Sequence, residues 1–99
     1  MNVVLTDAAL ADLEDIGDYI ARDNPRRAVT FVDELVGHCR RLGDMPRAFP
    51  LVPRYEREGV RRLPHGNYLI FYRIGFDSVD ILHVLNGAQD VEAVLFPGE

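Results

Sequence analysis

Lysine is absent from this 99-residue sequence, cysteine occurs once, and no hydrophobic run is long. A membrane-spanning helix needs about 20 consecutive apolar residues, so no such span is expected. The single Cys39 excludes an internal disulfide and a thiolate zinc site, and it fits a reducing compartment. The first residues lack the basic and long apolar segments of a secretory signal, so we expect a cytoplasmic protein.

The residues that are present predict one domain over residues 1–99. Hydrophobic residues make up 47% and charged residues 27% of the chain, as in globular proteins. This length supplies one modest core and not two. Arginine, the only strongly basic residue type, suits fixed bidentate contacts with carboxylate or phosphate, although a GC-rich genome would give the same composition.

The net charge of −5 is distributed unevenly. Residues 1–45 contain nine acids and five arginines, whereas residues 46–73 contain six arginines and two acids. Residues 74–99 contain five acids and neither arginine nor lysine. The overall acidity argues against nucleic-acid binding across the whole surface, so no direct nucleic-acid contact is expected. The middle segment still leaves room for a local basic face.

Two consecutive helices are predicted in the first half of the chain. Thr6 is placed to N-cap a helix that ends near Arg22. Asn24 and Pro25 begin the next helix, as N-cap and first helical residue, and Gly43 marks its end. The short link between them predicts an antiparallel helical hairpin. The apolar stripe of the first helix consists of Ala9, Leu13, Ile16 and Ile20.

The remaining elements predict an α+β domain, with an N-terminal strand, the helical hairpin and a three- to four-stranded antiparallel sheet packed against the helices. Prolines make residues 44–58 an extended connector over the surface. Residues 91–96 form either a short strand or a helical turn. The predicted strands are Asn2–Leu5, Gly59–Pro64, Tyr68–Ile74 and Val79–Leu85.

The strand Tyr68–Ile74 is apolar or aromatic at every position except Arg73. Such a run predicts a strand that is buried on both faces. A buried guanidinium is costly unless it is paired. We therefore expect Arg73 to meet Asp80 across the hairpin or to meet a helix carboxylate.

Four segments carry a family pattern: ADLEDI at 11–16 with Tyr19-Ile20, NPRRA at 24–28 leading into Phe31 and Leu35, GVRR at 59–62 followed by YLIFYR at 68–73, and DILHVL at 80–85. Their order and spacing resemble the ParE/RelE superfamily of toxins from type II toxin–antitoxin systems, and the ParE branch most closely. The resemblance spans almost the whole chain.

The resemblance implies one of two activities. ParE-like members are non-enzymatic poisons of DNA gyrase, whereas RelE-like members cut mRNA on the ribosome. Cutting RNA needs proton-transfer groups and cations that stabilise the phosphate, which RelE-like chains supply with lysines, arginines and a tyrosine near the C-terminus. This chain has no lysine and no tyrosine after Tyr72. The ParE branch is favoured, with no catalytic residues, metal or cofactor expected.

By this resemblance, the residues that contact the target are Arg61, Arg62, Arg73, His83 and Gln89. Paired arginines form charge-assisted, bidentate bonds with acidic groups of a partner protein. Internal salt bridges from Arg61 and Arg62 to Glu56, Glu58 or Asp80 are an equal alternative. A structural histidine, rather than a general base, is the favoured interpretation of His83, because no acid–nucleophile partner is evident.

The segment from residue 83 to residue 90 departs from the family pattern. Many members read RVLHGxRD there, whereas this chain reads HVLNGAQD. His83, Asn86 and Gln89 therefore replace more basic or titratable residues. A third interpretation follows, in which the chain is an attenuated toxin that still binds its antitoxin.

The resemblance also implies a ParD-like antitoxin and a hetero-oligomeric complex. Such antitoxins lay an amphipathic helix in an apolar groove or add a strand to a sheet edge. We expect the groove along the helical hairpin and the proline-rich connector, lined by Leu13, Phe31, Leu51 and Tyr55. Plain core packing is the stronger alternative for Leu13 and Phe31. The acids Asp12, Glu14, Asp15 and Asp18 are interpreted as a solvated helix face and not as a metal cluster.

Overall fold

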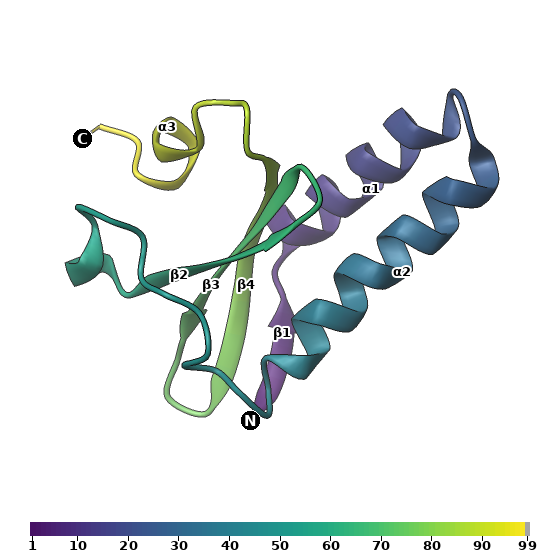
Figure 1. The fold of residues 1–99 in the computed structure, drawn as a ribbon. Coiled ribbons are helices and arrows are strands. Elements are labelled where there is room, and N and C mark those ends of the chain that lie inside the picture. Colours follow the sequence, from purple (N-terminus) through teal and green to yellow (C-terminus); the bar gives the residue numbers. More distant parts are fainter. Residues whose placement is uncertain (99) are drawn as a thin grey trace.

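The computed structural model describes residues 1–98 and shows a four-stranded sheet with helices on both of its faces (Figure 1). The elements in chain order are β1 (Asn2–Leu5), α1 (Asp7–Ala21), α2 (Pro25–Arg41), a 3₁₀ turn (Glu56–Glu58), β2 (Val60–His65), β3 (Tyr68–Ile74), β4 (Ser78–Asn86) and α3 (Val91–Leu95). Among these residues, no helix combines the length and apolarity that crossing a bilayer requires.

Both long helices begin at the predicted caps. The Thr6 hydroxyl accepts a hydrogen bond from the Ala9 amide at 3.2 Å. The Asn24 side chain accepts one from the Arg27 amide at 3.0 Å, and Pro25 is the first residue of α2. These side chains satisfy amides that have no partner within the helix, so the local sequence fixes both starting points.

The sheet is mixed, and the prediction of a purely antiparallel sheet was wrong in this respect. Its strand order is β1-β4-β3-β2, and β1 runs parallel to β4 with Asn2 opposite Ser78 and Leu5 opposite Ile81. The other two pairs, β2–β3 and β3–β4, are antiparallel. Parallel neighbours need a long connection between them. Here the helical hairpin α1–α2 and the strands β2 and β3 lie between β1 and β4 in the chain. The α+β class itself is confirmed.

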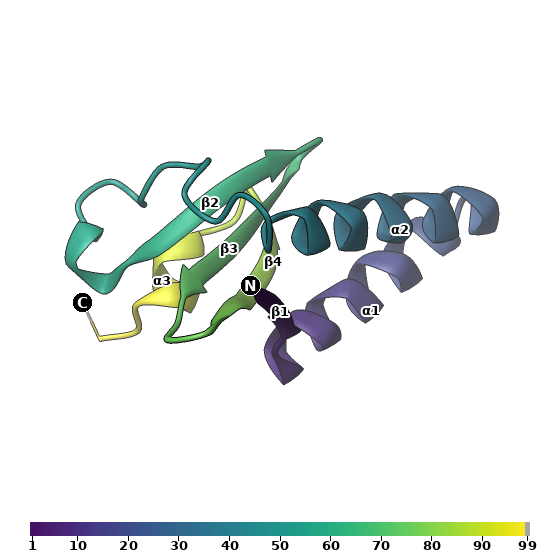
Figure 2. The same cartoon turned by 90° about the horizontal axis from the view of Figure 1, so that it is seen from below.

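The two faces of the sheet support separate hydrophobic clusters. Ile70 and Tyr72 of β3 pack on the face toward α1 and α2. Phe71, which lies between them, packs on the opposite face with Leu85 and Phe96 at the α3 end of the chain. Successive strand residues point to opposite faces, so one strand contributes to both clusters. Figures 1 and 2 show the turn between α1 and α2 projecting beyond the sheet.

The middle of β3 is buried as predicted, but Arg73 is not. Phe71 and Tyr72 are completely buried, whereas Arg73 is exposed near the end of the strand. Asp80 is aligned with Arg73 in the ladder, yet its carboxylate accepts a hydrogen bond from Ser78 instead. The hydrogen bond of Arg73 is a long one of 3.5 Å to the Glu58 carbonyl. The expected buried ion pair is therefore absent from the described residues.

Part of the connector and the C-terminal segment pack together on the sheet face opposite α1 and α2. Val91–Leu95 is helical, which decides between the two predicted states. Leu51 of the connector forms a bridge with Arg61, and the Val52 amide donates to the Val60 carbonyl at 2.8 Å. The connector thereby covers part of the outer edge of β2.

Candidate functional site

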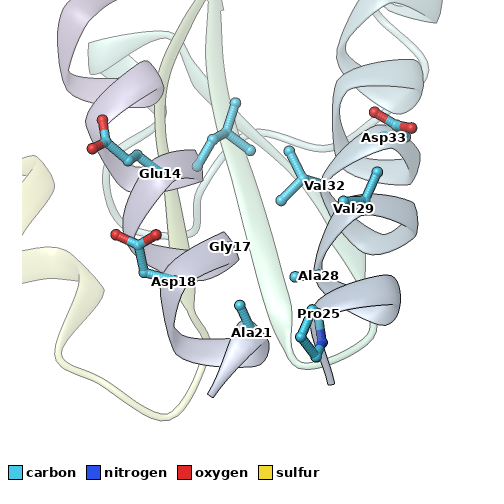
Figure 3. Close-up of a pocket in the computed structure, with 10 residues that line it drawn as sticks. Glu14, Gly17, Asp18, Ala21, Pro25, Ala28, Val29, Val32 and Asp33 are labelled. Atoms are coloured by element: carbon cyan, nitrogen blue, oxygen red, sulfur yellow. The ribbon is translucent and has the colours of Figure 1, made fainter. Parts of the chain in front are cut away.

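An apolar groove of about 430 Å³ lies between α1 and α2 (Figure 3). Leu13 and Ala28 are buried beneath it, and Val29 and Val32 stand along its α2 side. Three acids, Glu14, Asp18 and Asp33, complete the walls together with small residues. The full lining is Leu13, Glu14, Gly17, Asp18, Ala21, Pro25, Ala28, Val29, Val32 and Asp33.

Small side chains at facing positions create this groove. A Cβ on Gly17 would lie 3.5 Å from a methyl of Val32, an ordinary van der Waals contact, so the missing side chain leaves unfilled space between the helices there. Ala21 and Ala28 fill little of the space beside it, as Figure 3 shows. The sequence around Gly17 therefore produces a shallow apolar channel on the surface of the helical hairpin.

The four residues predicted to bind the antitoxin do not lie together. Leu13 lines the groove. Phe31 is buried, and its ring centroid is 5.4 Å from that of His65 at the end of β2. Leu51 pairs with the β2 edge, and Tyr55 stacks on Phe96 with ring centroids 4.1 Å apart. The connector packs beside the sheet, so the groove extends over the hairpin alone.

Arg61 and Arg62 point to opposite faces of the sheet. Arg61 lies opposite Tyr72, and its guanidinium donates to the Phe49 carbonyl at 2.7 Å. The Tyr72 hydroxyl donates to the Pro46 carbonyl at 2.8 Å, and burial raises the pKa of Tyr72. Arg61 and Tyr72 therefore hold the connector in place. Arg62 lies opposite Phe71 on the other face.

Neither arginine forms an ion pair within residues 1–98, so the alternative of internal salt bridges to Glu56, Glu58 or Asp80 is not realised. Arg62 shares its face of the sheet with Arg73, because their ladder partners Phe71 and Val60 belong to one cluster. These two arginines are the basic pair of that face.

His83 is tied to α1 by Asp12. The Asp12 Oδ2 atom lies 2.8 Å from His83 Nδ1 and accepts the Val84 amide at 2.9 Å. The contact occurs where the β3–β4 register shifts after Phe71. The contact joins β4 to α1 through Nδ1 of His83, and it supplies the acid partner that the sequence did not reveal. The interpretation of Asp12 as a solvated acid was wrong, since its partner lies on a distant strand.

Gln89 lies apart from the arginines. It is exposed in the turn after β4 and borders a small polar depression with Asp12 and Tyr19 of α1. Asn86 accepts a hydrogen bond from the Ala88 amide at 2.9 Å, which shapes this turn. The predicted target-binding residues are thus divided among both sheet faces and the α1 side of the molecule.

Phe76, which sequence reasoning did not select, is fully exposed at the tip of the β3–β4 hairpin. The Gly75 amide donates to the Ser78 carbonyl at 2.7 Å and closes this turn. Arg73 is exposed three residues before Phe76. The sequence did contain a signal for this exposure. Phe76 lies in a turn between two apolar strands, and a side chain at the tip of a turn points away from the core.

The described residues contain no group of three or more histidine, cysteine, aspartate or glutamate side chains that is arranged to hold a metal ion. The arrangement offers surfaces instead: the α1–α2 groove and the Arg73–Phe76 hairpin tip.

Comparison with known proteins agrees with the family pattern. The profile of the family described as "ParE toxin of type II toxin-antitoxin system, parDE" matches residues 3–91. No curated protein matches the sequence. The chain is a toxin of a type II toxin–antitoxin system by this match. Within that class it belongs to the ParE toxin family.

Two of the solved structures that match the chain illustrate the similarity. A chain of the chromosomal ParDE system from P. aeruginosa has 25% sequence identity and a TM-score of 0.75, over 87% of this chain and 95% of that chain. A chain of the toxin–antitoxin complex RelBE2 from Mycobacterium tuberculosis has 26% identity and a TM-score of 0.57, over 86% of this chain and 95% of that chain. Both come from toxin–antitoxin systems, which supports an antitoxin partner.

Proposed function

We propose that this toxin inhibits DNA gyrase in the cytoplasm by protein–protein contact and is neutralised by a ParD-like antitoxin. The family match and the higher TM-score with the ParDE chain support this branch over the RelE-like one. In this proposal the toxin acts by binding, and the α1–α2 groove receives the antitoxin.

The exposed hairpin tip is the observation that carries the proposal. Phe76 is fully exposed and contributes nothing to the core, while Arg73 extends from the same hairpin. Aromatic residues and arginine are enriched where proteins contact one another. A fully exposed phenylalanine is therefore better explained as an anchor for a partner protein than as a stabilising residue.

The C-terminal quarter of the chain argues against RNA cleavage. Residues 74–99 contain neither lysine nor arginine, so they supply no fixed cation for a phosphate in the transition state. Their one histidine, His83, is hydrogen-bonded to Asp12. That contact uses Nδ1 and leaves Nε2 able to accept a proton, so the lack of fixed cations, and not the state of His83, argues against RNA cleavage.

Induction of the toxin without its antitoxin tests the proposal, with pulse labels that follow the synthesis of DNA, RNA and protein. Early loss of DNA synthesis with a DNA-damage response is expected. Immediate loss of protein synthesis would instead indicate mRNA cleavage. No loss in any of the three would indicate an attenuated toxin, and either result would overturn gyrase inhibition.

A purified system tests the hairpin tip directly. The Phe76→Ser variant should lose inhibition of gyrase supercoiling and keep its melting temperature, because the replaced ring has no packing contacts to lose. Leu10→Ser, which changes a half-exposed apolar residue on α1, is the matched control and should inhibit gyrase normally. Equal inhibition by the two variants would exclude Phe76 as an anchor.

A further inference from the structure

We propose that the α1–α2 groove selects a partner helix whose apolar stripe is flanked by basic residues on both sides. The inference rests on the proposed antitoxin partner and specifies the chemistry of the segment that the groove accepts. It is carried by the combination of an apolar floor, unpaired carboxylates on both walls and the spacing of those carboxylates.

The floor of the groove is apolar and shallow. Leu13 is 5% exposed and Ala28 is 6% exposed, so both present only a small surface at the bottom. Val29 is 63% exposed on the α2 wall, so most of its side chain is open to a partner. Covering this surface removes apolar area from water, and small or medium apolar side chains of a helix fit the space.

The walls carry one sign of charge. Glu14 and Asp18 stand on α1 and Asp33 stands on α2, as Figure 3 shows. None of the three forms an ion pair with another residue of the described chain. Among the lining residues there is no basic side chain. The carboxylates thus have no ion-pair partner among residues 1–98 and complement cations brought by another molecule.

Two other carboxylates of the chain form ion pairs with arginine. Glu34, also on α2, forms an ion pair with Arg27 at 2.6 Å. Glu92 on α3 forms one with Arg54 at 2.7 Å. Ion pairing is therefore available to some acids of this chain, whereas the acids that border the apolar floor, like several exposed acids elsewhere, form no ion pair among the described residues.

This charge pattern discriminates among occupants. A second copy of the toxin would bring the same three acids against themselves, and like charges in contact disfavour association. A nucleic acid would be repelled by the same walls. A basic amphipathic helix is the occupant that meets both the apolar floor and the acidic walls.

The spacing of the acids gives the pattern on the partner. Glu14 and Asp18 are one helical turn apart and share an edge of α1. A helix lying along the groove would place two cations four residues apart on that flank. The other flank needs one cation opposite Asp33.

Two synthetic peptides of about five helical turns test the inference. They share one stripe of alanine and leucine, and one has lysine at the flanking positions where the other has glutamate. Titration into the labelled toxin at low salt should show about tenfold tighter binding of the lysine peptide, as expected for three exposed ion pairs. The preference should shrink at high salt. NMR shifts should locate the bound peptide on the groove.

Paired variants separate the walls from overall charge. The triple variant Glu14→Gln, Asp18→Asn, Asp33→Asn should lose the lysine preference. A second triple variant, Asp15→Asn, Asp44→Asn, Asp77→Asn, removes the same charge from exposed positions outside the groove and should keep the preference. Weak binding of both peptides, equal binding, or equal behaviour of the two triple variants would overturn the inference.

Measuring gyrase inhibition by the first triple variant distinguishes failure of this inference from failure of the proposed function. The groove and the Phe76 tip lie on different elements, so gyrase inhibition is expected to survive loss of the acids. A toxin that prefers the lysine peptide but does not inhibit gyrase would overturn the target and leave the groove assignment intact.

Discussion

Asp12 and His83 lie 71 positions apart in the chain, and their side chains meet with Oδ2 2.8 Å from Nδ1. The same Asp12 oxygen accepts the Val84 amide. Nearby, the Thr6 hydroxyl donates to the Ile81 carbonyl at 2.6 Å. The beginning of α1 is thereby hydrogen-bonded to the irregular part of β4, and that part of the strand receives the polar partners that its ladder does not supply.

Asp12→Ala should destabilise the fold by about 1–3 kcal/mol, because it leaves the partly buried Val84 amide without its acceptor. Urea unfolding followed by circular dichroism measures the change. Asp15→Ala, an exposed acid on the same helix, is the control and should alter stability by less than about 0.5 kcal/mol. Equal effects of the two substitutions would show that the Asp12 bonds contribute nothing.

The hydrogen bonds of Glu34 should make the free energy of unfolding depend on pH. Hydrogen bonds from Arg27, and then from His65, lower the pKa of Glu34 from 4.5 to about 2. Its contribution is therefore fully present above pH 4.5 and is lost as the pH falls toward 2. The difference in melting temperature between the wild type and Glu34→Gln should shrink over that interval. A difference that stays constant from pH 6 to pH 2 would contradict this linkage.

The Cys39 thiol should resist modification while the protein is folded. Cys39 is completely buried, and burial raises the pKa of its thiol to about 11. Since the thiolate is the reactive form, a disulfide reagent at pH 8 should react slowly with native toxin and rapidly in denaturant. Fast reaction of the native protein would mean that α2 opens readily.

Alanine substitutions at Gly43 and Gly37 should change the stability of the fold in opposite directions. A Cβ on Gly43 would lie 2.5 Å from the Met1 carbonyl oxygen, so Gly43→Ala forces the backbone beside β1 to shift and should cost about 1–3 kcal/mol. Gly37 lies within α2 with nothing within 4 Å of its added Cβ. Gly37→Ala should stabilise by about 0.5–1 kcal/mol. Thermal unfolding of both variants measures the contrast, and two changes of the same sign would contradict it.

The helices were predictable because their determinants are local. Thr6 and Asn24 each accept a hydrogen bond from the amide three residues ahead, and Pro25 suits the first turn of a helix. The direction of β1 was not predictable in the same way. Its four residues pair with a strand more than 70 positions later, and alternation along a strand does not reveal whether its neighbour is parallel.

The candidate site was predictable only in part. Leu13 was expected at a groove and lines one, but Tyr55 faces the second cluster beside Phe96. Asp12 shares its helix with exposed acids, and nothing local distinguishes it from them. Only the position of His83 and the Val84 amide across the fold makes it a structural residue.

The place of β4 in the sheet has a consequence for synthesis of the protein. β4 pairs with both β1 and β3, although it is the last strand in the chain. During translation, β1 has no partner until Ser78–Asn86 has left the ribosome, so the sheet closes only when most of the chain exists. A chain that stops before Ser78 leaves β1 and β3 without the partner that β4 provides. Unpaired strand edges promote aggregation. A chain that stops before Ser78 also lacks the Gly75–Ser78 hydrogen bond that closes the turn beside Phe76.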